Sequence, residues 1–363
     1  MKHLWIAGTT ALLLAGSASA QTPPAGYPAD YADLIAAART EGSLLIYTNL
    51  SNDNLGPVID AFKEVYPDID VQSVEMGPSE AFSRYAAETG TGVASADLVV
   101  ANSIPDWVRA VEGGTLDPYT SPEQANLPGW SYPEPGLYTF STDPMVTIYN
   151  KLTVPADLQV ASMEAYFANI TAHPDVFEGK VGTYDGRYAF GGSIGYAFAA
   201  HHGDAAWEWF AAAGPMTRPG GGAGGMIERT LTGELASSFF VSAPVVLSRL
   251  DPALEQVLGW TFPSDGTPVF LRGMGIMAEA QNKAAARVFL DFVLSEPGQY
   301  AVAAGNLTPY RPGVAPEAPN VYSLDEVIAA IGDAEKLIMI DYDSDMVANF
   351  EAFTTRWGAA FNM

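Results

Sequence analysis

The stretch "LLIYTNLSND", Leu44 to Asp53, changes from apolar to polar at its midpoint. Four of its first five residues are apolar, whereas amides, a hydroxyl and a carboxylate dominate the second half. Beyond it, apolar residues recur with the spacing of one helix face: Leu55, Val58, Ile59, Phe62 and Val65. The pattern predicts a buried strand that leads through a polar turn into an amphipathic helix.

The same order recurs along the first third of the chain. Strands predicted at 71–76 and 97–101 are each followed by a polar turn and a helix, with Ser103 as the N-cap of the later helix. Strands that alternate with helices predict an α/β fold, with a mostly parallel sheet covered by helices on both faces.

The pattern changes after this first unit. Residues 112–144 are rich in Pro, Gly, Ser and Tyr, have little periodicity and are typical of a linker-like passage. A second unit follows, with strands predicted at 145–150, 180–184, 237–243 and 269–277. Helices are predicted near 162–170, 193–213, 225–233, 282–295, 323–332 and 343–360. A chain of 363 residues accommodates two such domains.

The N-terminus has the features of a signal peptide. A basic "MKH" precedes the apolar run "LWIAGTTALLLAG", and Ala18 and Ala20 occupy the small-residue positions before Gln21. The apolar run is shorter than the ~20 residues that a membrane span needs. We therefore expect residues 1–20 to be removed by cleavage after Ala20, and the protein to be exported to the periplasm.

Composition excludes several classes of partner. Cleavage would remove Lys2 and no acidic residue, which takes the net charge from −25 to −26. Such a charge argues against nucleic acid and against anionic lipid surfaces. The absence of cysteine excludes disulfides, thiolate metal sites and a cysteine nucleophile.

Three polar turns, at 49–54, 77–80 and 102–104, lie where strands meet helix starts. In a parallel sheet such turns gather at the carboxyl edge of the strands, where ligands bind and helix N–H groups favour negative charge. The alternative is that their polar side chains only cap helices. We predict ligand contacts from this edge by Ser51, Asn52, Ser79, Asn102 and Ser103.

"GGSIG", Gly191 to Gly195, fits the G-x-S-x-G motif of serine hydrolases, with Ser193 as nucleophile. His201 and His202 follow on the same predicted helix and could not fold back onto Ser193 as a general base. A secreted serine hydrolase is therefore the alternative function, and no catalytic residue is assigned.

Cofactor and metal motifs are poorly supported. "GGGAGG", Gly220 to Gly225, follows "TRP" instead of a strand, so the dinucleotide context fails, although Arg218 beside it could face an anion. "DYDSD", 341–345, lacks the glycine of a calcium loop, and adjacent histidines on a helix cannot chelate together. We expect no cofactor and no metal site.

Several segments, in order along the chain, resemble the extracellular solute-binding proteins of bacterial ABC importers. The resemblance is to the group that includes ferric-iron, thiamine and aminoethylphosphonate binders. The matching segments are "EGSLLIYT" at 41–48, "SADLVV" at 95–100, "GGTLDPYTSPE" at 113–123, "IYNK" at 148–151, "GKVGTYD" at 179–185, "AAARVFLDFVLSEPGQ" at 284–299 and "PYRPGV" at 309–314.

The resemblance implies two α/β lobes with a ligand cleft between them, joined by crossing strands. We place lobe 1 at 27–130 and 263–312, and lobe 2 at 131–262 and 313–363. The resemblance also implies a small-molecule ligand, no chemistry on that ligand, and delivery to a permease in the inner membrane. We expect the protein to be a monomer. Tyr149 and Asn150 are expected near the hinge.

One departure from the group bears on the ligand. Its iron-binding members have adjacent tyrosines where this chain has Phe239 and Phe240, and phenyl rings cannot ligate Fe³⁺. The remaining donors suit a small polar organic ligand, such as a carboxylate or a phosphonate, while a cationic amine or a metal complex remains an alternative. From the second lobe we predict contacts by Ser193, whose turn is expected to open a helix, Arg218 and Ser237.

Overall fold

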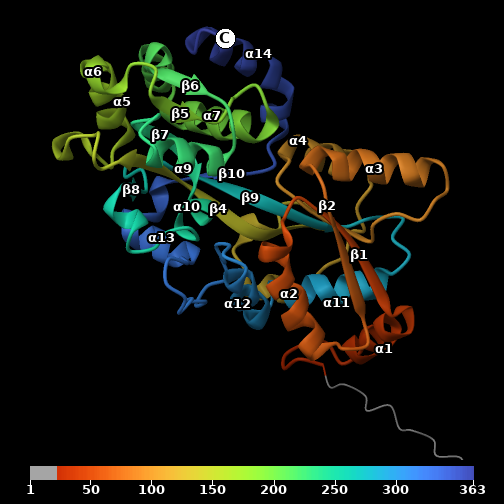
Figure 1. Ribbon diagram of the computed structural model, residues 1–363. Helices are drawn as coiled ribbons and strands as arrows, with labels where there is room; N and C mark the ends of the chain where they lie inside the picture. Colours follow the sequence, from red (N-terminus) through yellow and green to blue (C-terminus); the bar gives the residue numbers. More distant parts are fainter. Residues whose placement is uncertain (1–22) are drawn as a thin grey trace, which may run out of the picture.

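The computed structural model describes residues 23–363. The predicted signal peptide and its cleavage site lie outside the described residues. Figure 1 shows two lobes, each an α/β layer structure, with strands β4 and β9 running between them.

The first lobe has the predicted succession of strands and helices. The strands are β1 (Ser43–Thr48), β2 (Asp70–Glu75) and β3 (Leu98–Ala101). The helices are α1 (Tyr31–Glu41), α2 (Asn52–Val65), α3 (Pro78–Gly90), α4 (Ile104–Glu112), α11 (Lys283–Leu294) and α12 (Glu296–Ala304). β1 pairs in parallel with both β2 and β3, which confirms the prediction from the opening stretch.

Helices cover both faces of this half of the sheet. Ile46 of β1 points into a core with Phe62 of α2 and Phe289 of α11. Its neighbour Tyr47 points the other way, into a core with Trp107 of α4. Successive residues of a strand face opposite sides, so one buried strand supplies both cores.

Two long strands carry the chain between the lobes. β4 (Leu137–Asn150) pairs antiparallel with β9 (Thr267–Ile276), and β9 also pairs with β3. The predicted linker-like passage was wrong over 137–144, which is the first half of β4. Ser, Asp and Pro lower the strand propensity of this segment, but burial and antiparallel pairing with β9 stabilise it as a strand.

The second lobe continues the sheet from β4. Its strands are β5 (Val181–Thr183), β6 (Thr217–Pro219), β7 (Ser237–Ser242), β8 (Leu258–Thr261) and β10 (Leu337–Ile340). Its helices are α5 (Met163–Ala172), α6 (Pro174–Phe177), α7 (Ala189–His202), α8 (Asp204–Ala213), α9 (Ala223–Leu231), α10 (Ala243–Leu247), α13 (Leu324–Ile331) and α14 (Ser344–Ala360). The helix predicted at 193–213 is two helices, because Gly203 adopts a φ of 62° between α7 and α8.

The sheet path through both lobes is β2-β1-β3-β9-β4-β7-β5-β6, with β10 beside β9 and β8 beside β4. Within residues 23–363, five strand pairs are parallel and four are antiparallel. The antiparallel pairs all involve β4 or β9, the strands that cross between the lobes. Among the described helices, none is long and apolar enough to span a membrane.

Candidate functional site

A cleft of about 550 Å³ lies between the lobes, beside the crossing strands. The first lobe contributes the end of β1, the start of α2 and the turn after β3. The second lobe contributes the segment after β5 and the residues at the starts of α7, α9 and α10. The lining residues are Asn49, Leu50, Ser51, Asp53, Asn54, Asn102, Asp143, Tyr184, Phe190, Ala223, Ser242, Pro244, Val245, Ser248, Arg249, Arg272, Asn306 and Leu307.

Arg272 is a buried cation at the base of this cleft. It lies on β9 and is only 7% exposed. Its Nη1 donates a hydrogen bond of 2.8 Å to Oδ1 of Asn49, the one hydrogen bond that joins the guanidinium to a described residue. Nε is buried without an acceptor among those residues. Burial lowers the pKa of Arg272, an effect that the nearby charge of Asp143 opposes.

Asp143 is the buried anion of the same cleft. It lies on β4, is 8% exposed, and accepts a hydrogen bond of 2.7 Å from Oγ of Ser242. Burial raises the pKa of Asp143 to about 6, although the Ser242 hydrogen bond and the charge of Arg272 both act to lower it. The hydroxyl of Tyr184 accepts a hydrogen bond from the backbone N–H of Ser242 at 3.4 Å.

Strand register places the two charges on one face of the sheet. Arg272 lies opposite Ser141 in the β4–β9 ladder, and Asp143 is two residues along β4 from Ser141. Residues two apart on a strand share a face, so Arg272 and Asp143 are diagonal neighbours, a relationship with about 7–8 Å between Cα atoms. No ion pair within 4.0 Å joins these two described residues.

Two asparagines connect Arg272 to the first lobe. Oδ1 of Asn49, just after β1, accepts from Arg272 and also, at 3.3 Å, from the backbone N–H of Asn102. Oδ1 of Asn102 is buried without a donor among residues 23–363. The first lobe thus presents one unsatisfied acceptor and a cation held by a neutral amide.

Charged side chains also lie at the edge of the cleft. Asp53 is exposed in the first turn of α2, and Arg249 is exposed after α10. The guanidinium of Arg249 packs against Gly224 of α9, where a Cβ would lie 2.9 Å from Nη2. A larger residue at 224 would therefore displace this arginine.

A family model described as bacterial extracellular solute-binding protein matches residues 58–330. The chain belongs to this family of bacterial extracellular solute-binding proteins. This confirms the family that the sequence segments resemble. No curated protein matches the chain in sequence.

Solved structures of solute-binding proteins share the two-lobed fold. A substrate binding protein of the ABC transporter from Agrobacterium tumefaciens is 21% identical, with a TM-score of 0.75 over 88% of this chain and 94% of that chain. The Bordetella ferric binding protein is 22% identical, with a TM-score of 0.66 over 88% and 98%. AfuA from Actinobacillus pleuropneumoniae, solved with fructose-6-phosphate, is 21% identical, with a TM-score of 0.67 over 89% and 99%.

In this solute-binding protein, two of the predicted contact residues line the cleft. They are Ser51, whose Oγ donates to Oδ1 of Asn54 at 2.9 Å, and Asn102. Asn52 is exposed on the first turn of α2 and is not among the lining residues. Ser79 and Ser103 also lie outside the lining.

Ser79 and Ser103 serve a different contact in the first lobe. Both hydroxyls donate to Oδ2 of Asp106, at 2.6 Å for Ser79. Their polar atoms therefore already have a partner in α4. Ser103 is the N-cap residue of α4, as predicted, but its hydroxyl makes no capping hydrogen bond to the helix backbone.

The predicted contacts from the second lobe lie outside the cleft lining. Nδ2 of Asn150 donates to the carbonyl of Thr230 at 2.8 Å, and Oγ of Ser237 bonds to the hydroxyl of Tyr166 at 2.8 Å. Tyr149 lies against Gly259, and Arg218 lies against Gly179.

Ser193 is in the second turn of α7, not at its start. Its side chain is buried, and Oγ donates to the carbonyl of Ala189 at 2.7 Å. The motif glycines are explained by packing, since a Cβ on Gly191 would lie 2.6 Å from the carbonyl oxygen of Asp185 and one on Gly195 would lie 2.9 Å from the ring of Phe353 in α14. The G-x-S-x-G pattern therefore marks a close contact between α7 and α14.

Phe239 and Phe240 are not among the residues that line the cleft. Both are buried in the second-lobe core, where Phe239 packs against Phe167 and Phe240 against Phe198. Among residues 23–363, no group of three His, Cys, Asp or Glu is placed to hold a metal ion.

Sequence reasoning missed the two charges at the base of the cleft. Asp143 lies in "TFSTDPMVTIYN" and Arg272 in "VFLRGMGIM", each a lone charge in a buried strand. A charge in such a strand is costly unless it is paired or used, and this was the signal that could have identified both.

Proposed function

We propose that this protein is the receptor of an ABC importer and that it captures a small organic anion in the cleft between its lobes. The observation that carries the proposal is Arg272. It holds a full positive charge at the base of the cleft, yet its guanidinium has only one neutral hydrogen-bond partner among the described residues. An anionic group of the solute would supply the missing acceptors.

Energetics support an anion at this place. Burying an uncompensated charge is costly, and a guanidinium offers several N–H donors that match carboxylate or phosphate oxygens. The start of α2 at Ser51 and the start of α9 at Ala223 also border the cleft. Unpaired N–H groups at both helix starts favour negative charge there.

The size of the cleft suits a small organic solute. Ligand pockets of about 300–1,000 Å³ hold drug-sized molecules, and this cleft has about 550 Å³. AfuA, with the same fold, was solved with fructose-6-phosphate, which carries a phosphate on a small organic body. We therefore favour a carboxylate, phosphonate or phosphate ester over a free metal ion.

Cellular placement follows from the family and the N-terminus. An extracellular solute-binding protein works outside the inner membrane, and we infer that cleavage after Ala20 leaves a mature chain starting at Gln21. A permease in the inner membrane would receive the solute, and we expect the receptor to act as a monomer. The intact mass of periplasmic protein tests the cleavage site, and a retained Lys2 would contradict it.

Arg272→Gln tests the proposed function. A thermal-shift screen over small carboxylates, phosphonates, phosphate esters and amines first identifies a ligand, and calorimetry then measures its affinity. The variant should bind the anion about 100-fold more weakly, since two charge-assisted hydrogen bonds of about 1.5 kcal/mol each are lost.

Arg218→Ala is the matched control. It removes an arginine of the second lobe that lies outside the cleft lining, so the affinity should stay within about twofold. A folded Arg272→Gln protein that keeps full affinity for every anion would refute the proposal.

A further inference from the structure

The cleft carries opposite charges in equal number. Its lining contains two arginines and two aspartates, a formal sum of zero: Arg249, Arg272, Asp53 and Asp143. A binding site is complementary in charge to its ligand, so a lining without excess positive charge is a poor match to a solute that is only negative.

The two charges at the base do not neutralise each other directly. Arg272 and Asp143 share one face of the β4–β9 ladder, yet no N–O distance between them is within 4.0 Å. Instead, Asn49 of the first lobe holds the guanidinium and Ser242 of the second lobe holds the carboxylate. Each charged group is hydrogen-bonded to a neutral side chain, and the two neutral side chains lie on opposite sides of the cleft.

The surroundings of Asp143 suit an ammonium group. Oδ1 accepts from Ser242, while Oδ2 has no donor among the described residues. The rings of Tyr184 and Phe190 line the same cleft, edge to face with 5.0 Å between their centroids. A carboxylate beside aromatic rings is the chemistry that binds a cationic amine.

We infer that the solute is dipolar, with an anionic group that binds Arg272 and an ammonium group that binds Asp143. The inference rests on the proposed function, because it assumes an anion at Arg272. It makes Asp143 the residue that selects amine-bearing anions over plain ones of the same size.

Matched probes separate the two ends of such a solute. O-phosphoethanolamine is compared with ethyl phosphate, and 4-aminobutyrate with butyrate, by calorimetry on the mature protein at pH 7.5. In each pair the anionic group is kept and only the amine is removed. A third compound of each series, 2-hydroxyethyl phosphate or 4-hydroxybutyrate, replaces the amine by a neutral donor.

The wild-type protein should bind the amine-bearing compound at least about tenfold more tightly than both of its analogues in one or both series. This comparison needs no variant, so it does not depend on the folding of a mutant. Equal affinity for the amine and the plain anion, or for the amine and the hydroxyl compound, would overturn the inference.

Asp143→Asn then assigns the selectivity. Asparagine keeps an oxygen acceptor for Ser242 but removes the charge, so the preference for the amine should fall to about twofold or less. Selectivity that survives in Asp143→Asn would overturn the role of this residue. If anions bind through Arg272 without any amine preference, the inference fails alone. If no anion of the wider thermal-shift screen binds, the proposed function fails with it.

Discussion

Gly192 shows how one residue's size controls the packing of the second lobe. It lies where α7 contacts α14 and the segment after β5, and a Cβ there would be 2.6 Å from both Phe350 and the carbonyl of Gly186. A backbone carbonyl cannot move aside cheaply, so an added methyl group would force the helices apart. Gly192 occupies a variable position of the G-x-S-x-G pattern, and packing explains why this position is a glycine.

Gly192→Ala should therefore lower the free energy of unfolding by about 1–3 kcal/mol, the cost of overpacking a core. Urea unfolding measures it. Gly90→Ala is the control, because nothing lies within 4 Å of a Cβ at that glycine of α3, and no loss is expected.

Ser193→Ala completes the series at the neighbouring position. It removes a hydroxyl bonded within the helix, outside the cleft lining, so ligand affinity should remain within about twofold. Ester hydrolysis that depends on Ser193, or a clear loss of affinity, would show that the serine has the functional role that its motif suggested.

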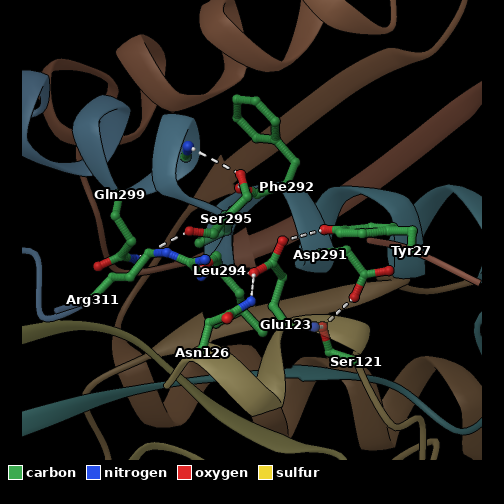
Figure 2. A network of polar contacts seen from close by, with 12 residues as sticks. Tyr27, Ser121, Glu123, Asn126, Asp291, Phe292, Leu294, Ser295, Gln299 and Arg311 are labelled. Carbon is green, nitrogen blue, oxygen red and sulfur yellow. Dashed lines mark hydrogen bonds and ion pairs between the residues drawn. The ribbon is translucent and has the colours of Figure 1, made fainter. Parts of the chain in front are cut away.

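At the scale of elements, one buried carboxylate forms hydrogen bonds to several segments of the first lobe. Asp291 of α11 accepts hydrogen bonds from Ser121 at 2.5 Å and from Tyr31 and Tyr119 at 2.7 Å. Figure 2 shows it beside Glu123, which accepts from Tyr27 and pairs with Arg311. These contacts join α1, α11 and the loop before β4.

The network predicts a defined dependence of stability on pH. Burial raises the pKa of Asp291 to about 6, despite the hydroxyl donors that act to lower it. The folded state then binds this proton more tightly than the unfolded state. Protonation of Asp291 therefore stabilises the fold fully below about pH 4, and this stabilisation is lost as the pH rises through 6.

Asp291→Asn removes this titration. When the pH is raised from 4 to 7.5, the wild type should lose up to about 3 kcal/mol of unfolding free energy through Asp291, and the variant should not show this loss. Urea unfolding at both pH values checks it, with the exposed Asp157→Asn as control. A difference that does not change with pH would contradict the assignment to Asp291.

At the scale of the whole molecule, the protein surface and the proposed anionic solute carry charge of the same sign and repel each other. The chain has a net charge of −25, whereas the proposed anion site depends on one buried arginine. Surface repulsion acts over the Debye length, which shrinks from about 30 Å at 0.01 M salt to about 8 Å at 0.15 M. Contacts inside the cleft are screened much less.

Association of a solute with a net charge of −1 should therefore accelerate when salt is raised from 0.01 to 0.15 M, by up to about tenfold. Stopped-flow measurements of the association rate constant test this. A solute of zero net charge, such as 4-aminobutyrate, should show little change. Slower association of the anion at high salt would mean that the cleft's local field dominates.

The sequence by itself determined the α/β class, the succession of strands and helices in the first lobe, and the family. These follow from local periodicity and from short segments that are read in order along the chain. The place of Ser51 and Asn102 in the cleft lining could be predicted for the same reason, since each lies in a turn directly after a strand.

Only the tertiary structure decided which side chains meet in the cleft. Arg272 and Asp143 are 129 positions apart and become neighbours through the register of β4 and β9. Ser193 and Ser237 carry suitable hydroxyl groups, but helix and sheet packing buries them elsewhere. Local pattern sets the element in which a residue lies, whereas pairing and packing across the chain set the direction in which its side chain points.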